Sequence, residues 1–446
     1  MPADARTVVE LSRLLHTRTL TSEEVTERCL ATITEQDGSI NAFITVLADD
    51  ARAQARDADR EIAAGRSRGP LHGVPISLKD LIDVRGTATT AASRVRADHV
   101  ASSDAIVTSR LRDAGAVFVG KTNLHEFAFG TTNEDSAYGP VHHPLDLTRS
   151  PGGSSGGSAA SVLAKMAYAS IGTDTGGSIR IPSSVCGLVG LKPALGDVPV
   201  EGVLPLSTLL DHVGPMCRSV DDASVVYHVL RGTPQSGPIR ARELRGLRLG
   251  VPRPYFLDWL DPDVAATFDA TCERLARGGV ILEDVVVPHA PLAGPIYVHL
   301  ALPEAAAYHA ATLDSRGADY TSNVRLRIEM GRYVLAQDYI RAMMGRDALM
   351  RDVNAALDGR DALLLPTMAM PATKLGATTI SMHGIDEPIR NAMLRLTQVF
   401  NITGHPAITV PCGQTRAGLP IGLQAVGTRT IDLLEAAAAI EGALES

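Results

Sequence analysis

Serine and glycine are concentrated between residues 149 and 193, in two motifs whose residue types could do chemistry. The first is GGSSGGSAA at 152–160 and the second is GTDTGGSIRIP at 172–182. Glycine destabilises regular helices and strands, so such a cluster needs a reason in the backbone. The motifs alternate with apolar segments, which argues against a flexible linker. A glycine-rich loop inside a core is typical of sites where backbone N–H groups approach a ligand.

Another glycine motif, GAVFVGKT at 115–122, has the spacing of a phosphate-binding P-loop. A P-loop follows a strand and makes a turn between its two glycines. Here a helical pattern precedes Gly115, and residues 116–119 are expected to form an apolar strand. Because a loop and a strand cannot occupy the same residues, the sequence argues against nucleotide binding.

The segment GGSSG at 152–156 also fits the G-x-S-x-G nucleophile elbow of α/β-hydrolases, in which Ser154 would attack the substrate. That elbow follows a hydrophobic strand directly. The preceding residues, HHPLDLTRSP, are mostly polar and include two prolines. We therefore do not expect this elbow.

Lys79 lies upstream in GVPISLKD at 73–80 and completes a more specific pattern with the two serine motifs. On these three segments the chain resembles the amidase signature enzymes. The resemblance runs without a gap from Gly152 to Pro182, and it extends over most of the chain through GAVFVGKTNLHEFA, CGLVGLKP, DHVGPM, PCG and GLPIGLQ. It implies an α/β fold with a large mixed β-sheet surrounded by α-helices. It also implies hydrolysis of a carbon–nitrogen amide bond through a seryl acyl-enzyme.

The resemblance implies Ser178 as nucleophile, Ser154 as proton relay and Lys79 as base, with a cis peptide bond between Gly153 and Ser154. Elementary chemistry agrees, because a serine hydroxyl is a weak nucleophile until a base takes its proton. A lysine is a base only when neutral, so its ordinary pKa of about 10.4 must be lowered by burial. The apolar neighbours in PISLKDLI fit that need. Taken alone, Lys79 would fit better a surface lysine paired with Asp80, and the two serine motifs turn the interpretation toward catalysis.

Attack on an amide carbonyl also needs N–H groups that stabilise the oxyanion. The resemblance assigns this oxyanion hole to the backbone of Thr175, Gly176, Gly177 and Ser178. Two consecutive glycines let that backbone approach a substrate without Cβ atoms in the way. Asp174 and Arg180 match positions that support the loop. We expect a structural ion pair for Arg180 rather than contact with the substrate.

The resemblance also gives four substrate-binding residues, Ala128, Phe129, Gly130 and Gly153. One phenylalanine beside small neighbours predicts a modest, partly apolar pocket for a small-molecule amide. We expect a free-standing amidase, with a urea-type amide such as carboxybiuret or allophanate as a candidate substrate. No cofactor and no metal are implied.

One subgroup of the family is the glutamine-hydrolysing A subunit of tRNA-dependent amidotransferases. The segment RIEMG at 327–331 resembles it, which makes Arg327 a candidate for binding a substrate carboxylate. That subgroup has an acidic residue a dozen positions before the proline of HPAIT, where this chain has Leu394. Glutaminase activity therefore stays an alternative. A non-catalytic scaffold subunit is the alternative from another class, and the intact lysine and serine motifs argue against it.

Composition narrows the choice of partners. The 446 residues include 42 basic and 50 acidic side chains, a net charge of -8, without a basic stripe for nucleic acid. The five cysteines are scattered, which argues against a zinc site. The catalytic set of two serines and a lysine needs none of the 13 histidines, and His142 and His143 are expected to be solvated.

No signal peptide and no stretch of roughly 20 apolar residues is seen, so we expect a cytoplasmic protein without a membrane partner. The family suggests a homodimer, and the alternative is assembly with a small partner subunit.

The predicted elements suggest one domain over residues 1–446. A helical portion covers 1–66, with a capping box of Thr21 and Glu24 on a helix that ends near Gln36. The signature core covers about 67–230, where helical and strand patterns alternate. The C-terminal portion covers about 246–446, with helices over about 300–358 and two paired closing strands in HPAITVPCG and LPIGLQAVG. Residues 231–245 are predicted to be a surface connection.

Overall fold

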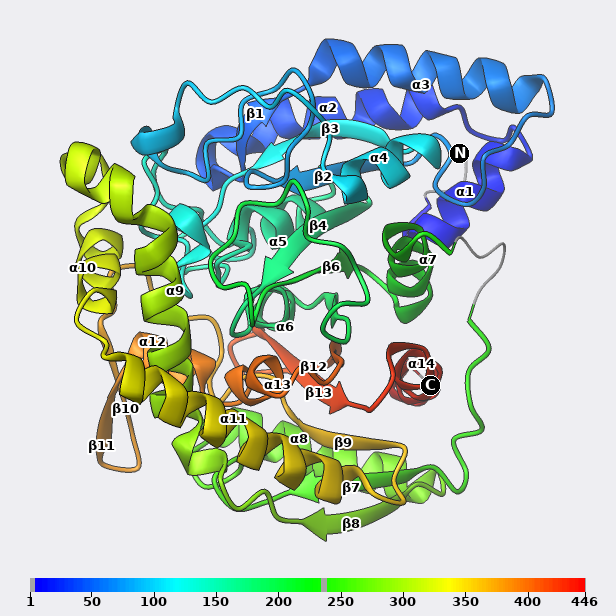
Figure 1. Ribbon diagram of the computed structural model, residues 1–446. Coiled ribbons are helices and arrows are strands. Elements are labelled where there is room, and N and C mark those ends of the chain that lie inside the picture. Colours follow the sequence, from blue (N-terminus) through cyan, green and yellow to red (C-terminus); the bar gives the residue numbers. More distant parts are fainter. Residues whose placement is uncertain (1–4, 234–238, 446) are drawn as a thin grey trace.

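A mixed sheet of 11 strands runs through the middle of the computed structural model, which describes residues 5–233 and 239–445 (Figure 1). The strand order is β1-β3-β2-β4-β6-β5-β12-β13-β9-β7-β8. The strands are β1 (Phe43–Val46), β2 (Pro75–Lys79), β3 (Val117–Thr122), β4 (Ala169–Asp174), β5 (Val189–Lys192), β6 (His212–Cys217), β7 (Arg248–Pro252), β8 (Ile281–Val285), β9 (Ala362–Pro366), β12 (Ala407–Gln414) and β13 (Pro420–Val426). A separate hairpin contains β10 (Thr379–Met382) and β11 (Ile385–Pro388).

Helices surround this sheet, and the predicted α/β class with a large mixed sheet is confirmed. They are α1 (Val8–His16), α2 (Ser22–Ile40), α3 (Ala48–Ala63), α4 (Ile106–Asp113), α5 (Gly156–Leu163), α6 (Arg180–Val185), α7 (Val220–Arg231), α8 (Pro262–Arg277), α9 (Ala293–Arg316), α10 (Ser322–Gly331), α11 (Ala336–Leu357), α12 (Ile389–Leu394), α13 (Gln398–Ile402) and α14 (Thr430–Glu445). Every residue of β2, β3, β4, β5, β6, β9 and β13 is buried. Such strands are typical of a sheet covered on both faces.

The N-terminal portion is less purely helical than predicted. The capping box is confirmed, since Glu24 N donates to Thr21 Oγ1 and Thr21 N donates to the Glu24 carboxylate. The helix it starts, α2, continues past Gln36 to Ile40, and β1 then pairs antiparallel with β3. A strand of four residues is too short for its alternation to stand out between two long helices.

The centre of the sheet brings together the segments that carry the motifs. Strand β2 pairs in parallel with both β3 and β4. Their carboxyl ends, at Lys79, Thr122 and Asp174, therefore share one edge of the sheet. Strand β3 runs through Lys121 and Thr122, and both side chains are fully buried. This geometry excludes the P-loop, as the sequence predicted.

The two C-terminal strands are paired as predicted, but they do not close the sheet at an edge. Strands β12 and β13 lie antiparallel to each other and are inserted between β5 and β9. The predicted surface connection at 231–245 falls partly outside the described residues, because 234–238 are not among them.

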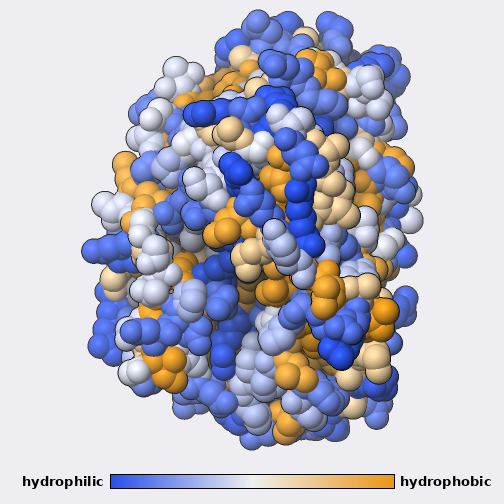
Figure 2. Space-filling model, turned by 60° about the vertical axis from the view of Figure 1, so that its left-hand side comes forward, coloured by the Kyte–Doolittle hydropathy of each residue, from blue (hydrophilic) through white to orange (hydrophobic). Residues whose placement is uncertain are grey.

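Helices α9 and α10 lie on the side of the molecule opposite α7 and α14, and α11 runs from that side across the lower part of the view (Figure 1). Turned toward the viewer, this side is largely hydrophilic, with separate hydrophobic patches (Figure 2). Its exposed apolar side chains include Leu326, Met330, Leu335, Ile340 and Met344. In the described part of the chain, none of the helices combines the length and the apolar character that a bilayer crossing requires.

Candidate active site

Lys79 ends strand β2 and is completely buried. Its Nζ lies 2.8 Å from Ser154 Oγ and 2.8 Å from Thr173 Oγ1, on the neighbouring strand β4. Burial lowers the pKa of Lys79 from its ordinary value to about 7, against the opposing effect of the Asp211 and Asp174 carboxylates. A large fraction of this lysine is therefore neutral near pH 7 and can accept a proton.

The alternative in which Lys79 is a surface residue paired with Asp80 is wrong. Both side chains are fully buried, and the Asp80 carboxylate pairs with Lys121 Nζ at 2.9 Å. Asp80 also accepts hydrogen bonds from the backbone N–H and the hydroxyl of Thr90. A second buried lysine thus carries the ion pair, and Lys79 has hydroxyl partners instead.

Ser154 lies in the loop before α5, and the peptide bond between Gly153 and Ser154 is cis, as the resemblance implied. The loop is packed against the segment around Asn133. A Cβ on Gly153 would lie 2.8 Å from Asn133 N, so only glycine fits here. The Asn133 Oδ1 atom accepts from Gly156 N at 3.0 Å. These contacts hold the Ser154 hydroxyl beside Lys79.

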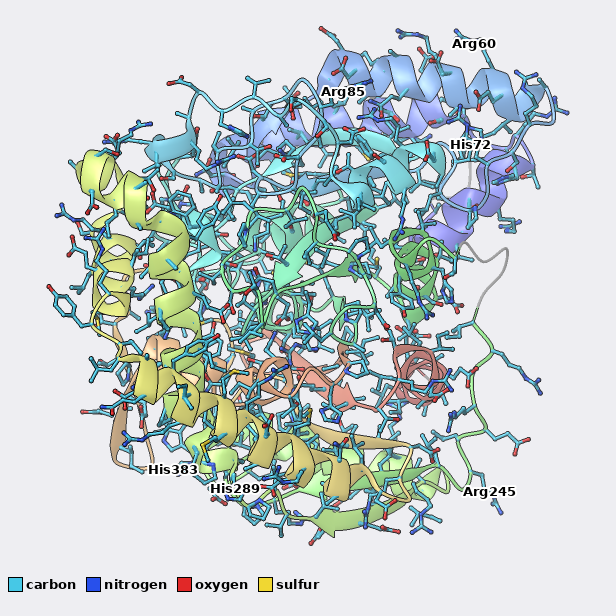
Figure 3. The ribbon with its side chains drawn as sticks, in the orientation of Figure 1. Arg60, His72, Arg85, Arg245, His289 and His383 are labelled. Carbon is cyan, nitrogen blue, oxygen red and sulfur yellow. The ribbon has the colours of Figure 1, made fainter. Side chains whose placement is uncertain are left out.

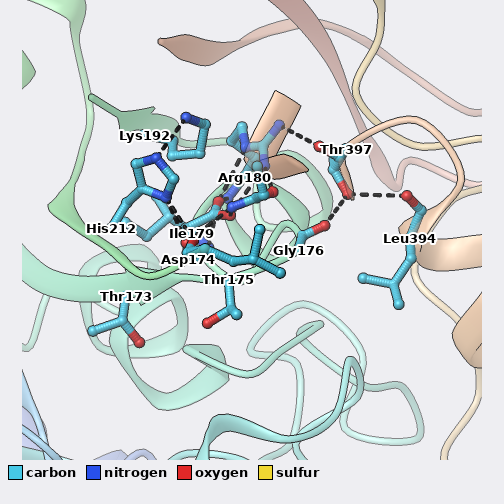
Figure 4. A network of polar contacts seen from close by, with 12 residues as sticks. Thr173, Asp174, Thr175, Gly176, Ile179, Arg180, Lys192, His212, Leu394 and Thr397 are labelled. Atoms are coloured by element: carbon cyan, nitrogen blue, oxygen red, sulfur yellow. Dashed lines mark hydrogen bonds and ion pairs between the residues drawn. The ribbon is translucent and has the colours of Figure 1, made fainter. Parts of the chain in front are cut away.

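The loop of residues 175–178 is fixed from several sides (Figure 4). Thr175 Oγ1 donates to Asp211 at 2.6 Å, and Thr397 Oγ1 donates to the Gly176 carbonyl at 2.6 Å. Gly177 has a φ of +142°, which only glycine adopts readily. Within residues 5–233 and 239–445, the N–H groups of Gly176, Gly177 and Ser178 donate to no protein acceptor.

Ser178 follows directly in this loop. Its carbonyl accepts from Ser155 N at 3.2 Å, which brings it next to the segment that carries Ser154. The residue keeps 5% of its surface exposed. Its hydroxyl has no protein hydrogen-bond partner in the described chain, and no direct bond between the Ser178 and Ser154 hydroxyls is present there. Within the described chain, N–H groups and a hydroxyl without protein partners thus lie together in a buried loop that keeps slight solvent access at Ser178.

Asp174 and Arg180 support the loop from behind, both completely buried (Figure 4). Arg180 Nη2 lies 3.0 Å from Asp174 Oδ1, and Asp174 Oδ2 also accepts from the N–H groups of Ile179 and Arg180. Burial alone would raise the pKa of Asp174, but the Arg180 charge outweighs it and holds that pKa well below its ordinary value. Arg180 therefore forms the structural ion pair that was expected.

The C-terminal portion contributes the remaining partners of this ion pair. Arg180 donates to the Thr397 carbonyl, to Gln424 Oε1 and to Asn401 Oδ1. Asn401 Nδ2 donates back to Asp174. No pattern in the sequence pointed to Thr173, Thr397, Asn401 or Gln424, because no feature of their local motifs marks them as partners of this site.

Three of the four predicted pocket residues, Ala128, Phe129 and Gly130, form a tight turn in and after the short helix Glu126–Ala128, and Gly153 lies in the loop before α5. Phe127 and Ala128 both have left-handed φ values, 52° and 59°. Gly130 lies against the His125 ring, since a Cβ there would lie 2.0 Å from His125 Nε2. The Phe129 carbonyl accepts from Arg327 Nη1 at 2.6 Å. The structure thus places Arg327 next to the predicted pocket wall.

Three residues beside the pocket were not predicted as substrate contacts. A Cβ on Gly176 would lie 2.9 Å from the Tyr297 hydroxyl and 3.0 Å from Leu394. The Arg390 guanidinium lies 5.8 Å from the centre of the Phe129 ring and 5.9 Å from that of Tyr297. Leu394 was noted in the sequence only because the amidotransferase subgroup has an acidic residue at that position. In the structure its side chain lies against Gly176, two residues before Ser178.

Two histidines lie at this site, because the His125 ring lies against Gly130 and His212 Nδ1 lies 3.2 Å from the Asp174 carbonyl; others lie far from it. Figure 3 shows His72 near one end of the molecule and His289 and His383 near the other. The expectation that His143 is solvated is wrong, because its ring is buried and bonds the Val185 carbonyl. In the described chain, no three His, Cys, Asp or Glu side chains are grouped to hold a metal ion.

Comparisons of the sequence and of the structure with known proteins agree with a site for amide hydrolysis. The family described as Amidase matches residues 24–433. The chain belongs to the amidase family. It is 37% identical to the A subunit of glutamyl-tRNA(Gln) amidotransferase from Koribacter versatilis, with 96% of each chain covered. As the family assignment indicates, the chain is an enzyme that hydrolyses carbon–nitrogen amide bonds.

Solved structures of the amidase family share the whole fold. A crystal structure of an amidase superposes with a TM-score of 0.93 at 35% identity, over 98% of this chain and 100% of that one. A second structure has a TM-score of 0.91 at 32% identity, over 97% of both chains. It is described as part of a vestigial protein complex that reveals the evolutionary origins of an s-triazine catabolic enzyme.

Proposed function

We propose that this amidase cleaves its substrate with Ser178 as nucleophile, Ser154 as proton relay and Lys79 as base. The single observation that carries the proposal is the 2.8 Å contact between the buried Lys79 Nζ and Ser154 Oγ, at the edge of the loop that holds Ser178. A neutral lysine accepts a proton through Ser154, and Ser178 then attacks the amide carbonyl. Return of that proton through the relay expels the amine and leaves a seryl ester, which water hydrolyses.

The backbone of residues 175–178 supplies the oxyanion hole in this proposal. The N–H groups of Gly176, Gly177 and Ser178 have no acceptor among the described residues, and hydrogen bonds of the Thr175 hydroxyl and the Gly176 carbonyl hold this backbone in place. No rearrangement is therefore needed when negative charge develops on the carbonyl oxygen. Asp174 and Arg180 position this loop and do not touch the substrate. Phe129 and Gly130 form one part of the pocket wall, together with the preceding Ala128. Gly153, in the loop before α5, forms the other part.

The experiment is release of ammonia or amine from primary amides, anilides, glutamine and urea derivatives, measured for the wild type and for Ser178→Ala. Release that depends on Ser178 supports the proposal and identifies the substrate class. Release that persists in Ser178→Ala would remove Ser178 as nucleophile. If no amide of the panel is hydrolysed, labelling by a fluorophosphonate probe distinguishes an enzyme whose substrate is outside the panel from a non-catalytic scaffold. The enzyme would react with the probe and the scaffold would not.

We further propose a small urea-type amide, such as carboxybiuret or allophanate, as the substrate. The support is the likeness to a structure whose description names the evolutionary origins of an s-triazine catabolic enzyme. A small amide needs few contacts beyond the oxyanion hole. Turnover of urea derivatives faster than of anilides in the same panel would support this choice.

Glutamine hydrolysis within a tRNA-dependent amidotransferase is the second candidate. Its support is the 37% identity to such an enzyme's A subunit, together with the position of Arg327 at the pocket wall. Against it stands the apolar Leu394, which contacts Gly176 where the subgroup has an acid. Ammonia release from glutamine at a rate equal to the best small amide would favour this candidate.

We propose that residues 1–446 act as one domain and that the protein is a cytoplasmic homodimer; the alternative assembly includes a small partner subunit. Support for one domain comes from the site itself, which needs Lys79 from the core and Asn401 from the C-terminal portion. Support for the partner comes from the relative that is named as one subunit of an amidotransferase. Light scattering of the purified chain tests the homodimer, and co-purification tests the complex with a small partner subunit.

A further inference from the structure

A cavity of about 440 Å³ lies at the amino end of β4, where Tyr168 precedes the strand and forms part of the cavity wall. The carboxyl end of the strand, at Asp174, follows six residues later, roughly 20 Å away, and leads to Ser178. In the described chain, none of the residues placed at the active site lines this cavity. The cavity is therefore separate from the active site.

The charge of the cavity wall has a single sign. Among the described residues, nine line the cavity, of which four are cations and none is an acid. The cations are Arg6, Arg28, Lys165 and Arg218. None of them has a carboxylate within 4 Å in the described part of the chain. A concave surface with one sign of charge raises the local concentration of ions of the opposite sign, so this cavity attracts anions.

Arg218 provides the deepest of these charges. Its guanidinium donates to the carbonyls of Arg6, Val162 and Ala167, and its central carbon lies 5.6 Å from the centre of the Tyr168 ring. Burial lowers the pKa of Arg218, but a guanidinium stays protonated in proteins. Carbonyl partners satisfy its N–H groups without neutralising the positive charge.

The acid whose charge reaches Arg218 lies outside the cavity. This acid is Asp222, which is fully buried and accepts from Val9 N at 3.0 Å. Burial raises the pKa of Asp222 to about 6, and its carboxylate forms no ion pair with Arg218 among the described residues. The cavity therefore keeps a net positive charge.

Lys165 supplies its charge from a strained backbone position. It follows Ala164, the last residue of α5, and has a left-handed φ of 61°. Glycine is usual at this place after a helix, because a side chain is unfavourable there. The chain thus has a cation at the cavity where a glycine would be conformationally easier.

The rest of the wall is apolar or neutral. Val25 and Cys29 are buried and lie on the same face of α2 as Arg28, at helical spacing. Burial raises the pKa of Cys29 to about 12, so its thiol stays neutral. The ring of Tyr168 adds an aromatic surface. The volume lies in the range of pockets that bind small molecules, and this wall suits an anion that has an apolar part.

We propose that this cavity is a binding site for a small organic dianion, such as a phosphate monoester or a dicarboxylate with a short apolar body. Arg28 and Lys165 bind the charged groups through N–H donors, and Arg218 attracts them by its charge. The apolar body lies against Val25 and the ring of Tyr168. This inference does not depend on the proposed function, because none of these residues takes part in the catalytic steps.

Calorimetric titration of the whole chain with phenyl phosphate and with phthalate tests the proposal, and the two probes distinguish a phosphate site from a dicarboxylate site. We expect the wild type and Ser178→Ala to bind at least one probe equally well. Lys165→Gly should bind it about tenfold more weakly, since one charge-assisted hydrogen bond is lost. Glycine suits the φ of 61°, so this variant should melt no lower than the wild type. Binding of neither probe to the wild type would overturn the proposal, as would equal affinity of the wild type and Lys165→Gly.

Arg18→Gly is the matched control, because Arg18 also has a left-handed φ, 56°, and does not line the cavity. It should bind the probe like the wild type. Arg28→Gln should weaken binding about tenfold, whereas Arg13→Gln in α1 should not. Equal weakening by the cavity variants and their controls would show a general charge effect and overturn the site.

Inorganic phosphate tests the apolar part of the assignment. We expect it to bind more weakly than phenyl phosphate, because it leaves Val25 and Tyr168 without a partner. Equal affinity for both would show that the cavity binds an inorganic anion only, and would overturn the assignment to an organic one. The bound probe should also raise the melting temperature of Ser178→Ala, which keeps this test independent of amide hydrolysis.

Discussion

Arg180 grips the Asp174 carboxylate at both oxygens, with Nε 3.0 Å from Oδ2 and Nη2 3.0 Å from Oδ1, directly behind the loop that carries Ser178. The same carboxylate accepts from the backbone N–H groups of Ile179 and Arg180. These bonds fix to one another the two ends of the loop of residues 175–178, which we call the catalytic loop. Because the whole pair is buried, its loss has consequences for both stability and activity.

Replacing Arg180 by methionine should destabilise the protein by about 3–5 kcal/mol, because it leaves the Asp174 charge buried without its partner. Urea unfolding followed by circular dichroism measures the free energy. Arg248→Met is the control, since Arg248 forms a half-exposed ion pair with Glu283 whose loss should cost no more than about 1 kcal/mol. Equal small costs for both variants would show that the buried pair does not stabilise the fold.

Catalysis should depend on pH through Lys79, whose pKa lies near 7. Below this pH, kcat/KM should fall about tenfold per unit as the lysine becomes protonated, and above it kcat/KM should level off. A profile of kcat/KM from acidic to alkaline pH on one uncharged amide measures this. A flat profile through pH 7 would show that another group is the base or that chemistry does not limit the rate.

Stability should depend on pH through the same residue. The pKa of Lys79 falls from 10.5 in the unfolded chain to about 7 in the folded one, so folding releases a proton between these values and stability decreases as pH falls through that window. Lys79→Met removes this cost. The variant should therefore gain more stability over wild type at about pH 7 than at about pH 10.5, measured by urea unfolding at both values. A gain that does not change with pH would contradict the buried, neutral lysine.

The catalytic loop should not tolerate a side chain at Gly177. A Cβ there would lie 2.3 Å from Thr397 Oγ1, and the φ of +142° is unfavourable for alanine. We expect Gly177→Ala to lower kcat by at least about tenfold and to reduce the melting temperature. Gly38→Ala in α2 is the control, because its Cβ meets nothing within 4 Å, and it should stabilise by up to about 1 kcal/mol. An active, stable Gly177→Ala would show that the loop moves freely.

Removing the Ser178 hydroxyl should abolish labelling by a fluorophosphonate probe and reduce amide hydrolysis by on the order of 10³-fold or more. Ser183→Ala is a matched control, because Ser183 is also buried and its hydroxyl has no hydrogen-bond partner in the described chain. That variant should label and react like the wild type. If the probe labelled Ser178→Ala but not Ser183→Ala, Ser183 rather than Ser178 would be the nucleophile.

The residues that could be identified from the sequence share one property, which is that each lies in a short motif. Lys79, Ser154 and Ser178 could be proposed because the motifs that hold them resemble those of the amidase signature enzymes. Tyr297 and Arg390 could not, since they approach Gly176 and Phe129 from α9 and α12, and no spacing links them to the serine motifs. Tertiary packing, rather than local pattern, brings them beside these residues.

The fold shows the same division. Long amphipathic helices and apolar strands were predicted near their observed places, because periodicity is a local signal. The four-residue strand β1 was missed, and β12 and β13 were expected to close the sheet, whereas they lie in its middle. Strand order depends on which buried surfaces fit together. His143 illustrates the same point, since its polar neighbours in sequence conceal its buried place in the fold.

The central place of β12 and β13 has a consequence for how the chain is made. A ribosome releases these strands last, so β5 and β9 leave it before the strands that lie between them exist. Until then their edges stay open and can pair with other chains. Thr397, Asn401 and Gln424 also emerge after the loop, so residues 175–178 lack their support until residue 424 has been synthesised. The nascent chain is therefore expected to stay inactive, and to need chaperone protection, until β13 has left the ribosome.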